Sequence, residues 1–312
     1  MAAFKHTSPA SRSSDSLLPK VREIELPTKP SWLEFLRSEV DPENATGPLA
    51  VYCFMTGFID AISFTAVFVW CGFQTGNFAQ LALALARLVQ NHDFVFHIAD
   101  QQALTSLVAF NFGASIGRLG DRIGPHTRLW LVSGTLLQAL FSLAAAFCIG
   151  WSGQDSIALV RGEPIWTNYL TSVGMALMAA SLGLQGIIGK RLNTHFGTTV
   201  VLTAVWVELV SDPGLFKLRN RIASRDYKIV ALIALFIGAI LARLVMGTIG
   251  AAGALGFAAF IRYLVAIVWI YVPGKGDGYT RLQDHEPEQD TSDGRRHGLE
   301  ALNYGTLSVV MA

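Results

Sequence analysis

Long apolar runs separated by short polar stretches fill the middle of the chain. A hydrocarbon core of roughly 30 Å is crossed by about 20 predominantly apolar helical residues. The pattern therefore predicts an all-α, polytopic membrane protein with six transmembrane helices. Their expected ranges are about 49–70, 103–119, 128–150, 168–189, 228–245 and 254–272.

Two further apolar stretches, 76–89 and 197–210, are too short to complete a crossing. Each has about 14 residues, which cover about 21 Å at 1.5 Å per residue. The first has a polar front that follows directly after a spanning run: Gln74, Thr75, Gly76 and Asn77. The sequence leaves open whether these short helices are re-entrant or lie at the membrane interface.

The two ends of the chain are polar. Residues 1–47 are rich in Ser, Pro and charge, and residues 273–312 lack a periodic apolar face. Both are predicted to be disordered tails. Within the first, "SWLEFLRSEV" is compatible with a short amphipathic helix at the membrane surface. The membrane domain is expected to cover 48–272.

Composition and charge agree with this reading. The chain is 52% hydrophobic and 15% charged, whereas soluble domains carry about 25% charged residues. Loops rich and poor in Lys and Arg alternate, which places both termini in the cytoplasm by the positive-inside rule. An eight-helix count would put Arg118, Arg122 and Arg128 outside. The expected partner is the lipid bilayer, with no nucleic acid, and the type of membrane stays undetermined.

The two halves of the membrane domain, 48–150 and 168–272, resemble each other. Gly57 matches Gly183 at an offset of 126 residues, and Gly113 matches Gly238 at an offset of 125. Three spanning helices per repeat is an odd number, so the second repeat should enter the membrane inverted. Inverted 3+3 repeats with short helices in matching places are common in transporters, whose sites lie near the midplane. Surface-lying helices without a transport role are the alternative.

Several stretches resemble a known family. "GFIDAISF", "TGNFAQLALAL", "FNFGASIGR" and "GLQGIIGKRL" are similar to the YoaK-like family of integral membrane proteins (DUF1275), a domain of unknown function. The resemblance covers roughly 48–272, and the long tails would suit a fungal member. It implies six helices and a transport role, without an established substrate. The sequence departs from the family pattern at Gly186 and Ala204, so we expect a degenerate second half-site.

Asp60 is the sharpest candidate for a functional residue. It lies near the middle of the first predicted helix and is the only ionisable residue between Glu43 and Arg87. A carboxylate at that depth costs about 2.5–3.5 kcal/mol on insertion scales and should face the bundle or a wet cavity. We expect Asp60 to couple a proton or cation, or to contact substrate. A carboxyl that only locks helices together is the alternative.

The start of the first short helix is the second candidate. Free N–H groups at a helix start suit a polar or anionic ligand, and Thr75 or Asn77 could cap that start. We also expect Arg262 to be a candidate for an ion pair with either carboxylate, Asp60 or Glu208, because pairing lowers the burial cost of both partners. The predicted substrate-binding set is Asp60, Gln74, Thr75, Gly76, Asn77, Gln185 and Thr203.

The leading functional hypothesis is a small transporter or permease for a polar or anionic solute. A membrane scaffold or regulator acting through its tails is the alternative. An enzyme is not expected, because the sequence has no nucleophile–base pair, metal-ligand set or cofactor fingerprint. The spacing Gly113-x-x-x-Gly117 indicates close helix packing and is compatible with a homo-oligomer.

Overall fold

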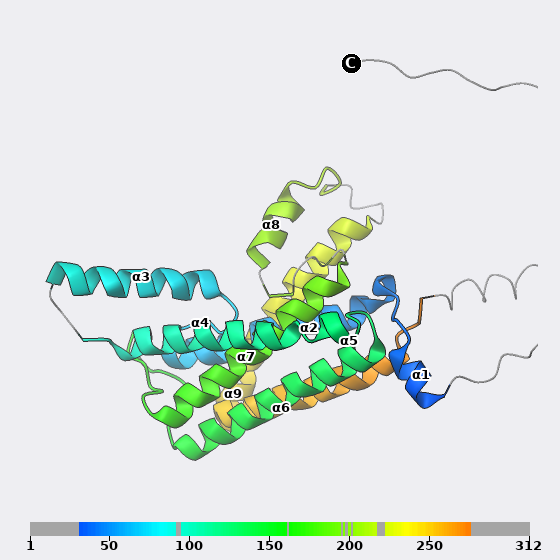
Figure 1. Cartoon of the computed structure of the whole chain (residues 1–312). Helices are drawn as coiled ribbons and strands as arrows, with labels where there is room; N and C mark the ends of the chain where they lie inside the picture. The colour runs from blue at the N-terminus through cyan, green and yellow to red at the C-terminus, as the bar shows by residue number, and fades with distance from the viewer. Residues whose placement is uncertain are drawn as a thin grey trace, which may run out of the picture.

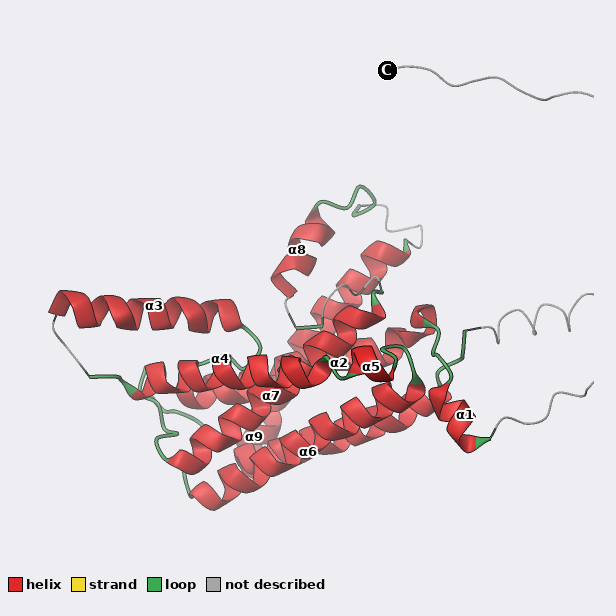
Figure 2. Cartoon of the chain, viewed as in Figure 1, coloured by secondary structure: helices red, strands yellow, loops and turns green. Residues whose placement is uncertain are grey.

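The structure is a computed structural model that describes residues 31–91, 95–160, 162–194, 196, 199–200, 202–216 and 222–275. Within these residues the fold is helical, with two isolated β-bridges in place of a sheet (Figures 1 and 2). The elements are α1 (Trp32–Arg37), η1 (Pro42–Ala45), α2 (Thr46–Val67), α3 (Gln74–Asn91), α4 (Ile98–Gly117), α5 (Gly120–Ile123), α6 (Arg128–Ser152), α7 (Tyr169–Leu192), α8 (Leu202–Val210) and α9 (Ala223–Tyr271).

Four of the described helices are long and apolar enough to cross a membrane: Pro42–Val67, Arg128–Ser152, Tyr169–Leu192 and Ala223–Tyr271. They indicate a membrane-embedded protein. The predicted helix at 103–119 appears as α4, which starts earlier, at Ile98, and includes Asp100 and Gln102. Those polar residues explain why α4 is not among the four apolar spans.

The predicted helices 228–245 and 254–272 are two limbs of α9. Gly250 alone leaves the helical conformation, with φ 73° and ψ 176°. Glycine adopts a positive φ without the clash that a Cβ would introduce. Figure 1 shows the chain turning back there, so that the yellow and orange limbs diverge from one corner. The eight-residue linker expected between the two helices is therefore reduced to one residue.

One end of the bundle joins loops that lie far apart in the sequence. Val40 N–H donates to the His126 carbonyl at 2.9 Å, and Asp41 N–H donates to the Pro273 carbonyl at 3.0 Å. The His126 ring lies 3.0 Å from the Arg191 carbonyl. We call this the terminal end, because α1 and the last described residues meet there (Figure 1).

The opposite, or far, end is built from the connection between α6 and α7. Ala158 N–H donates to the Thr65 carbonyl at 3.1 Å. Ala251 N–H, directly after the turn in α9, donates to Ser156 Oγ at 2.7 Å. The C-terminus of α2 and the turn between the limbs of α9 therefore lie together at this end.

The long segments alternate in direction between the two ends. The segments α2, α6 and the first limb of α9 run from the terminal end to the far end, and α4, α7 and the second limb run back. The start of α9 belongs to the terminal end because Ala223 and Tyr227 line a cavity of about 540 Å³ there with Thr46 and Asn193.

Helices α2 and α9 cross in close contact at two glycines. A Cβ added to Gly57 would lie 2.0 Å from the Leu235 carbonyl oxygen, and one added to Gly238 would lie 2.1 Å from the Phe54 oxygen. Only glycine allows two helix backbones to approach this closely. The contact fixes the first limb of α9 against α2.

Helices α4 and α7 cross in the same way. A Cβ on Gly113 would lie 2.0 Å from the Ala180 oxygen, and one on Gly183 would lie 2.0 Å from the Phe110 oxygen. Each of these four residues lies 125 or 126 positions from a residue of the α2–α9 crossing. The two crossings are thus matching contacts at the offset of the predicted repeat.

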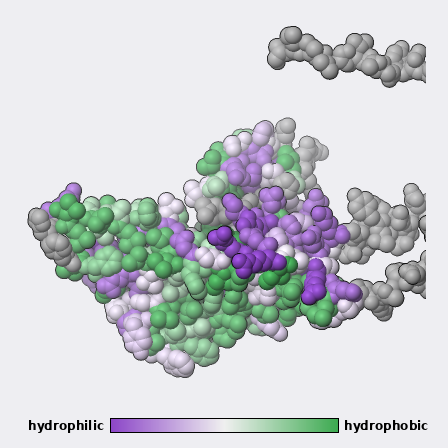
Figure 3. All heavy atoms as spheres, in the orientation of Figure 1, coloured by the Kyte–Doolittle hydropathy of each residue, from purple (hydrophilic) through white to green (hydrophobic). Residues whose placement is uncertain are grey.

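The outer surface is apolar along the helices and polar at the terminal end. Phe112, Leu140, Phe236 and Leu244 are among the large apolar side chains that are more than half exposed. In Figure 3 hydrophobic residues cover α3 and α6, and hydrophilic residues gather near α5 and α1. A bilayer would cover such a surface without a loss of hydration free energy.

The predicted N-terminal tail is ordered in its last third. Helix α1 begins at the capping box of Ser31 and Glu34, which confirms a short helix within 31–40. Val40 is completely buried and pairs with Gly274. Residues 1–30 and 276–312 lie outside the described residues. The scaffold hypothesis depends mainly on these tails, so the structure does not test it.

The two short helices differ in length from the prediction. Helix α3 has 18 residues and α8 has nine, against about 14 expected for each. Helix α3 runs antiparallel to α4, because Arg87 near its end pairs with Asp100 at the start of α4. Gln74 at its start donates to Ser106, farther along α4, at 3.1 Å. Helix α3 therefore begins inside the bundle and returns to the far end.

Candidate functional site

The break between α2 and α3, residues 68–73, is joined to α2 by Asp60. We call it the first break. The Asp60 side chain is 8% exposed, and Oδ1 accepts the Gly72 N–H at 2.7 Å. A Cβ on Gly72 would lie 2.9 Å from Asp60 Oδ2, so glycine permits this approach. A carboxylate that accepts a backbone N–H gains a charge-assisted bond. Asp60 therefore supplies a hydrogen-bond acceptor for a backbone N–H group of the segment between the two helices.

The polar front of α3 forms a packing network. Asn77 Nδ2 donates to the Trp70 carbonyl at 2.6 Å and to Ser106 Oγ at 3.1 Å. Gln74 Nε2 donates to the Cys71 carbonyl at 2.6 Å and also contacts Ser106. The side chain of Asn77 is thus a donor to the preceding loop, and it does not cap the helix as predicted.

Thr75 and Gly76 take different roles from those predicted. Thr75 is exposed, and no hydrogen bond of its side chain occurs within the described part of the chain. A Cβ on Gly76 would lie 2.7 Å from Phe73 Cδ1. Glycine at this position leaves room for the Phe73 ring over the first turn of α3.

The break before α8 is tied to the bundle by hydroxyl and amide groups. Thr56 Oγ1 donates to the Thr199 carbonyl at 2.7 Å. Gln185 Nε2 donates to the Tyr52 carbonyl and to Thr56 Oγ1, both at 2.9 Å. Gln185 is completely buried, so it joins α7 to α2 and lies away from any open surface.

The second break lacks the counterparts of the first network. Gly186 stands where Asp60 stands in the first half, and a Cβ there would lie 3.4 Å from Val200 Cγ2. Ala204 and Ala231 lie at the positions of Asn77 and Ser106 at offsets of 127 and 125 residues. The second break therefore has no carboxylate, amide or hydroxyl at these three positions, and its polar contacts come from Thr56 and Gln185 instead.

A cavity of about 530 Å³ connects the two breaks. Asp60 and Thr203 of the predicted set line it, whereas Gln74, Thr75, Gly76, Asn77 and Gln185 do not. Trp70 and Phe73 border it from the first break, and Val200 borders it from the second. The remaining lining residues come from α2, α8 and the first limb of α9: Gly57, Ala61, Phe64, Thr65, Leu202, Trp206, Leu235, Ala239 and Arg243.

Arg243 adds a basic side chain to the cavity that Asp60 also lines. Its side chain is exposed, and none of the ion pairs found among the described residues joins it to Asp60. Trp70 and Trp206 supply apolar walls with polar N–H tips. Volumes of roughly 300–1,000 Å³ with a few polar groups are typical of small-molecule sites. The cavity can hold a solute that combines an acceptor group with an apolar part.

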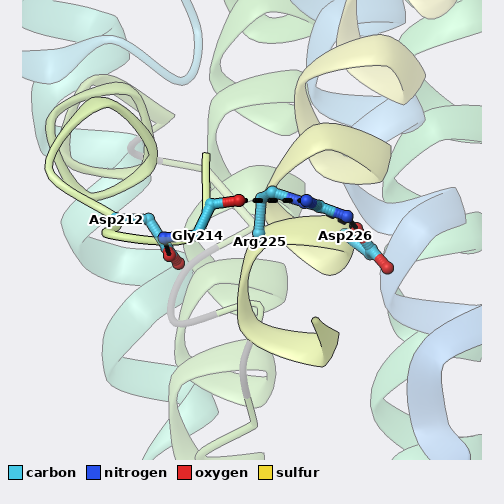
Figure 4. A network of polar contacts seen from close by, with 4 residues as sticks. All are labelled: Asp212, Gly214, Arg225 and Asp226. Atoms are coloured by element: carbon cyan, nitrogen blue, oxygen red, sulfur yellow. Dashed lines mark hydrogen bonds and ion pairs between the residues drawn. The ribbon is translucent and has the colours of Figure 1, made fainter. Parts of the chain in front are cut away.

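Helix α8 is held to α9 by a network after its last turn. Arg225 is 4% exposed and donates from Nη1 to the Gly214 carbonyl at 3.0 Å and from Nη2 to Asp226 at 2.6 Å. Gly214 N–H donates to Asp212 Oδ1 at 2.8 Å. Figure 4 shows Arg225 lying between Gly214 and Asp226. This network sets the position of α8, which carries Thr203 into the cavity.

Neither predicted ion pair of Arg262, with Glu208 or with Asp60, occurs among the described residues. Glu208 lies 3.7 Å from Lys228, on the outer side of α8, where its side chain is 57% exposed. Arg262 is completely buried and donates to Gln138 Oε1 at 2.6 Å. A pair of Glu208 with Arg262 would require α8 to lie against the second limb of α9, whereas Glu208 lies beside Lys228 at the start of the first limb.

A family model described as "Protein of unknown function (DUF1275)" matches residues 49–268, which is more than half of the chain. The chain belongs to the DUF1275 family. No curated protein and no solved structure matches it.

For this DUF1275 chain, sequence reasoning missed Arg243 as a cavity residue. Its position near the end of a predicted helix suggested a side chain that reaches toward the interface. The signal in the sequence is the spacing of Leu235, Ala239 and Arg243. Residues four positions apart lie on one face of a helix, and Leu235 faces Gly57. Within the described residues, no group of three or more His, Cys, Asp or Glu side chains could hold a metal ion.

Proposed function

We propose that this protein is a small-solute transporter whose binding site is the cavity between α2, α8 and the first limb of α9. The observation that carries the proposal is that Asp60 and residues from both helix breaks line one cavity of about 530 Å³. Transporters of known mechanism bind substrate between interrupted helices in this way. The solute is polar or anionic, with an acceptor group that Arg243 binds.

The six crossings, the inverted repeat and the cytoplasmic position of both termini belong to the same proposal. The alternating direction of the six long segments supports it, and so do the equivalent glycine crossings of α2 with α9 and α4 with α7. The terminal end carries Arg118, Arg122, Arg128, Lys190 and Arg191. The positive-inside rule favours the cytoplasm for such a cluster.

Asp60 would couple solute binding to the break. Its carboxylate accepts the Gly72 N–H, so a proton or a solute donor that takes this oxygen competes with the bond that holds the break. Loss of one charge-assisted bond is worth about 1.5–3 kcal/mol. That free energy is enough to shift a conformational equilibrium by about tenfold or more.

The test is solute uptake by purified protein in proteoliposomes, with a panel of organic anions, amino acids and sugars at several pH gradients. Arg243→Gln should raise the KM of the accepted solute about tenfold or more, because it removes a charged contact. Asp60→Asn should remove the dependence of uptake on the pH gradient. Arg118→Gln is the matched control, since Arg118 is exposed and does not line the cavity.

Two results would reject the proposal. One is the absence of saturable uptake for the whole panel in liposomes that contain folded protein. The other is solute uptake that is the same in Arg243→Gln, Asp60→Asn and the control variant Arg118→Gln.

A further inference from the structure

Arg262 is a charged side chain in the centre of the bundle. It lies in the second limb of α9 and is completely buried, as are Gln138 of α6 and Tyr52 of α2 beside it. Its Nη1 donates to Gln138 Oε1 at 2.6 Å. The contacts on either side, Arg128 with Val272 and Gly150 with Ala252, place this pair midway along α6.

Three N–H donor atoms in this cluster lack an acceptor within the described structure. They are Nε and Nη2 of Arg262 and, at full hydrogen-bond geometry, Nε2 of Gln138, which faces the Tyr52 oxygen. A guanidinium has five N–H donors and no acceptor, and it keeps its charge in proteins. A buried charge without a partner is costly, so such groups are paired or bind an ion.

The neighbouring hydroxyl groups are already engaged. Thr135 Oγ1 donates to the Leu131 carbonyl at 2.6 Å, so its single hydrogen is used and Tyr52 O–H is the donor in their 2.5 Å contact. The Tyr52 oxygen accepts the Trp269 N–H at 3.3 Å. No carboxylate is paired with Arg262 among the described ion pairs. The cluster therefore has surplus donors and a surplus positive charge.

We propose that Arg262 and Gln138 form a binding site for a small monovalent inorganic anion of the chloride type. One such anion supplies the missing negative charge and accepts the N–H groups of Arg262 Nε, Arg262 Nη2 and Gln138 Nε2. Both side chains are completely buried, which favours a compact ion over an organic anion. The site is separate from the proposed transport cavity, because neither residue lines it.

The place of the site in the fold gives the anion a structural consequence. Gln138 and Arg262 are 124 residues apart, within one or two residues of the repeat offset, so they occupy corresponding places in the two halves. The pair joins α6 to the second limb of α9. An anion bound there would hold the two halves together at the contact where equivalent helices meet.

The direct test is equilibrium binding of radiolabelled chloride to full-length wild-type protein purified in gluconate. We expect saturable binding, displaced by bromide but not by sulfate, because the site is compact and lies beside a single charge. We also expect Tm to rise with the logarithm of chloride concentration at constant ionic strength, since an anion that binds only the folded state stabilises it. The absence of saturable chloride binding by the wild-type protein would overturn the proposal and leave water as the partner of these donors.

A pair of variants locates the site. Arg262→Met should abolish both chloride binding and the chloride dependence of Tm, and it should be at least as stable as the wild type in gluconate, because an unpaired buried charge is removed. Arg118→Met, at an exposed helix end, should keep both responses. Chloride binding that survives in Arg262→Met would refute the assignment. If that variant fails to fold, the wild-type binding measurement decides.

Discussion

The glycine crossing of α2 with α9 predicts a specific loss of stability in Gly57→Ala. The added Cβ would lie 2.0 Å from the Leu235 carbonyl oxygen, whereas ordinary contact begins at about 3.4 Å, so the helices must separate by about 1.4 Å. The obstacle is backbone, which no rotamer change can move aside. Overpacking of this kind costs about 1–3 kcal/mol, and occasionally more.

The equivalent position in the second half makes the prediction sharper. Gly183→Ala places its Cβ 2.0 Å from the Phe110 oxygen and should therefore also cost about 1–3 kcal/mol. Gly256→Ala is the control. It lies in a helix with nothing within 4 Å of the added Cβ, so it should be neutral or stabilising by about 0.5–1 kcal/mol.

The assay is reversible unfolding of the purified protein in mixed micelles, followed by circular dichroism, with Tm as a second measure. Gly57→Ala and Gly183→Ala should both lower the free energy of unfolding, and Gly256→Ala should not. If Gly57→Ala were as stable as Gly256→Ala, the backbone contact would be wrong. If the first two differed by several kcal/mol, the two crossings would not be equivalent.

Three further predictions concern the ends and the first break. Asn77→Ala removes two hydrogen bonds that hold α3 to the bundle and should destabilise by about 1–3 kcal/mol, whereas the exposed Thr75→Ala should stay within ±0.5 kcal/mol; equal effects in unfolding experiments would contradict the network. Arg225→Met removes the bond to Gly214 and should speed amide hydrogen exchange in α8 while leaving α3 unchanged; unaltered exchange in α8 would show that the network does not hold it. Hydrogen bonds from the backbone and side chain of Ser31 lower the pKa of Glu34 below its ordinary value of 4.5, so the capping box contributes above that value and is lost as pH falls through the lowered pKa. Ser31→Ala removes the side-chain bond and keeps the larger backbone bond, so NMR titration should show the pKa of Glu34 returning part of the way toward 4.5.

The existence of the helices followed from the sequence because apolar runs of sufficient length are local signals. The importance of Asp60 could also be predicted from the sequence. An isolated carboxylate in an apolar run must either face a cavity or accept a hydrogen bond. The structure gives it both, through the cavity and Gly72. The two roles predicted for Asp60, contact with a solute and attachment of one helix to another, are therefore compatible with each other.

The partners of the polar residues could not be predicted in the same way. Gln74 and Asn77 meet Ser106 across about 30 residues, and Arg262 meets Gln138 across 124. Such contacts depend on which helices cross, and composition does not encode that choice. The polar front of α3 therefore suggested an open ligand site, although most of its groups are used for packing. The turn at Gly250 was hidden because three other glycines surround it within seven residues.

The two glycine crossings divide the bundle into two units, α2 with the first limb of α9 and α4 with α7. Any movement of one unit against the other, as the transport proposal needs, must change contacts that run between them. Gln185 of α7 makes such a contact, because its Nε2 donates to Tyr52 O and Thr56 Oγ1 of α2, while its own Oε1 has no partner in the described structure.

Gln185→Met removes two donated hydrogen bonds, but it also removes a buried acceptor that has no partner. The free energy of unfolding should therefore change by less than about 1.5 kcal/mol. If the contact holds the units in one arrangement, its loss should alter the maximal rate of uptake and leave KM unchanged, because Gln185 does not line the cavity. A change confined to KM would instead place Gln185 in contact with the solute and contradict its burial between the helices.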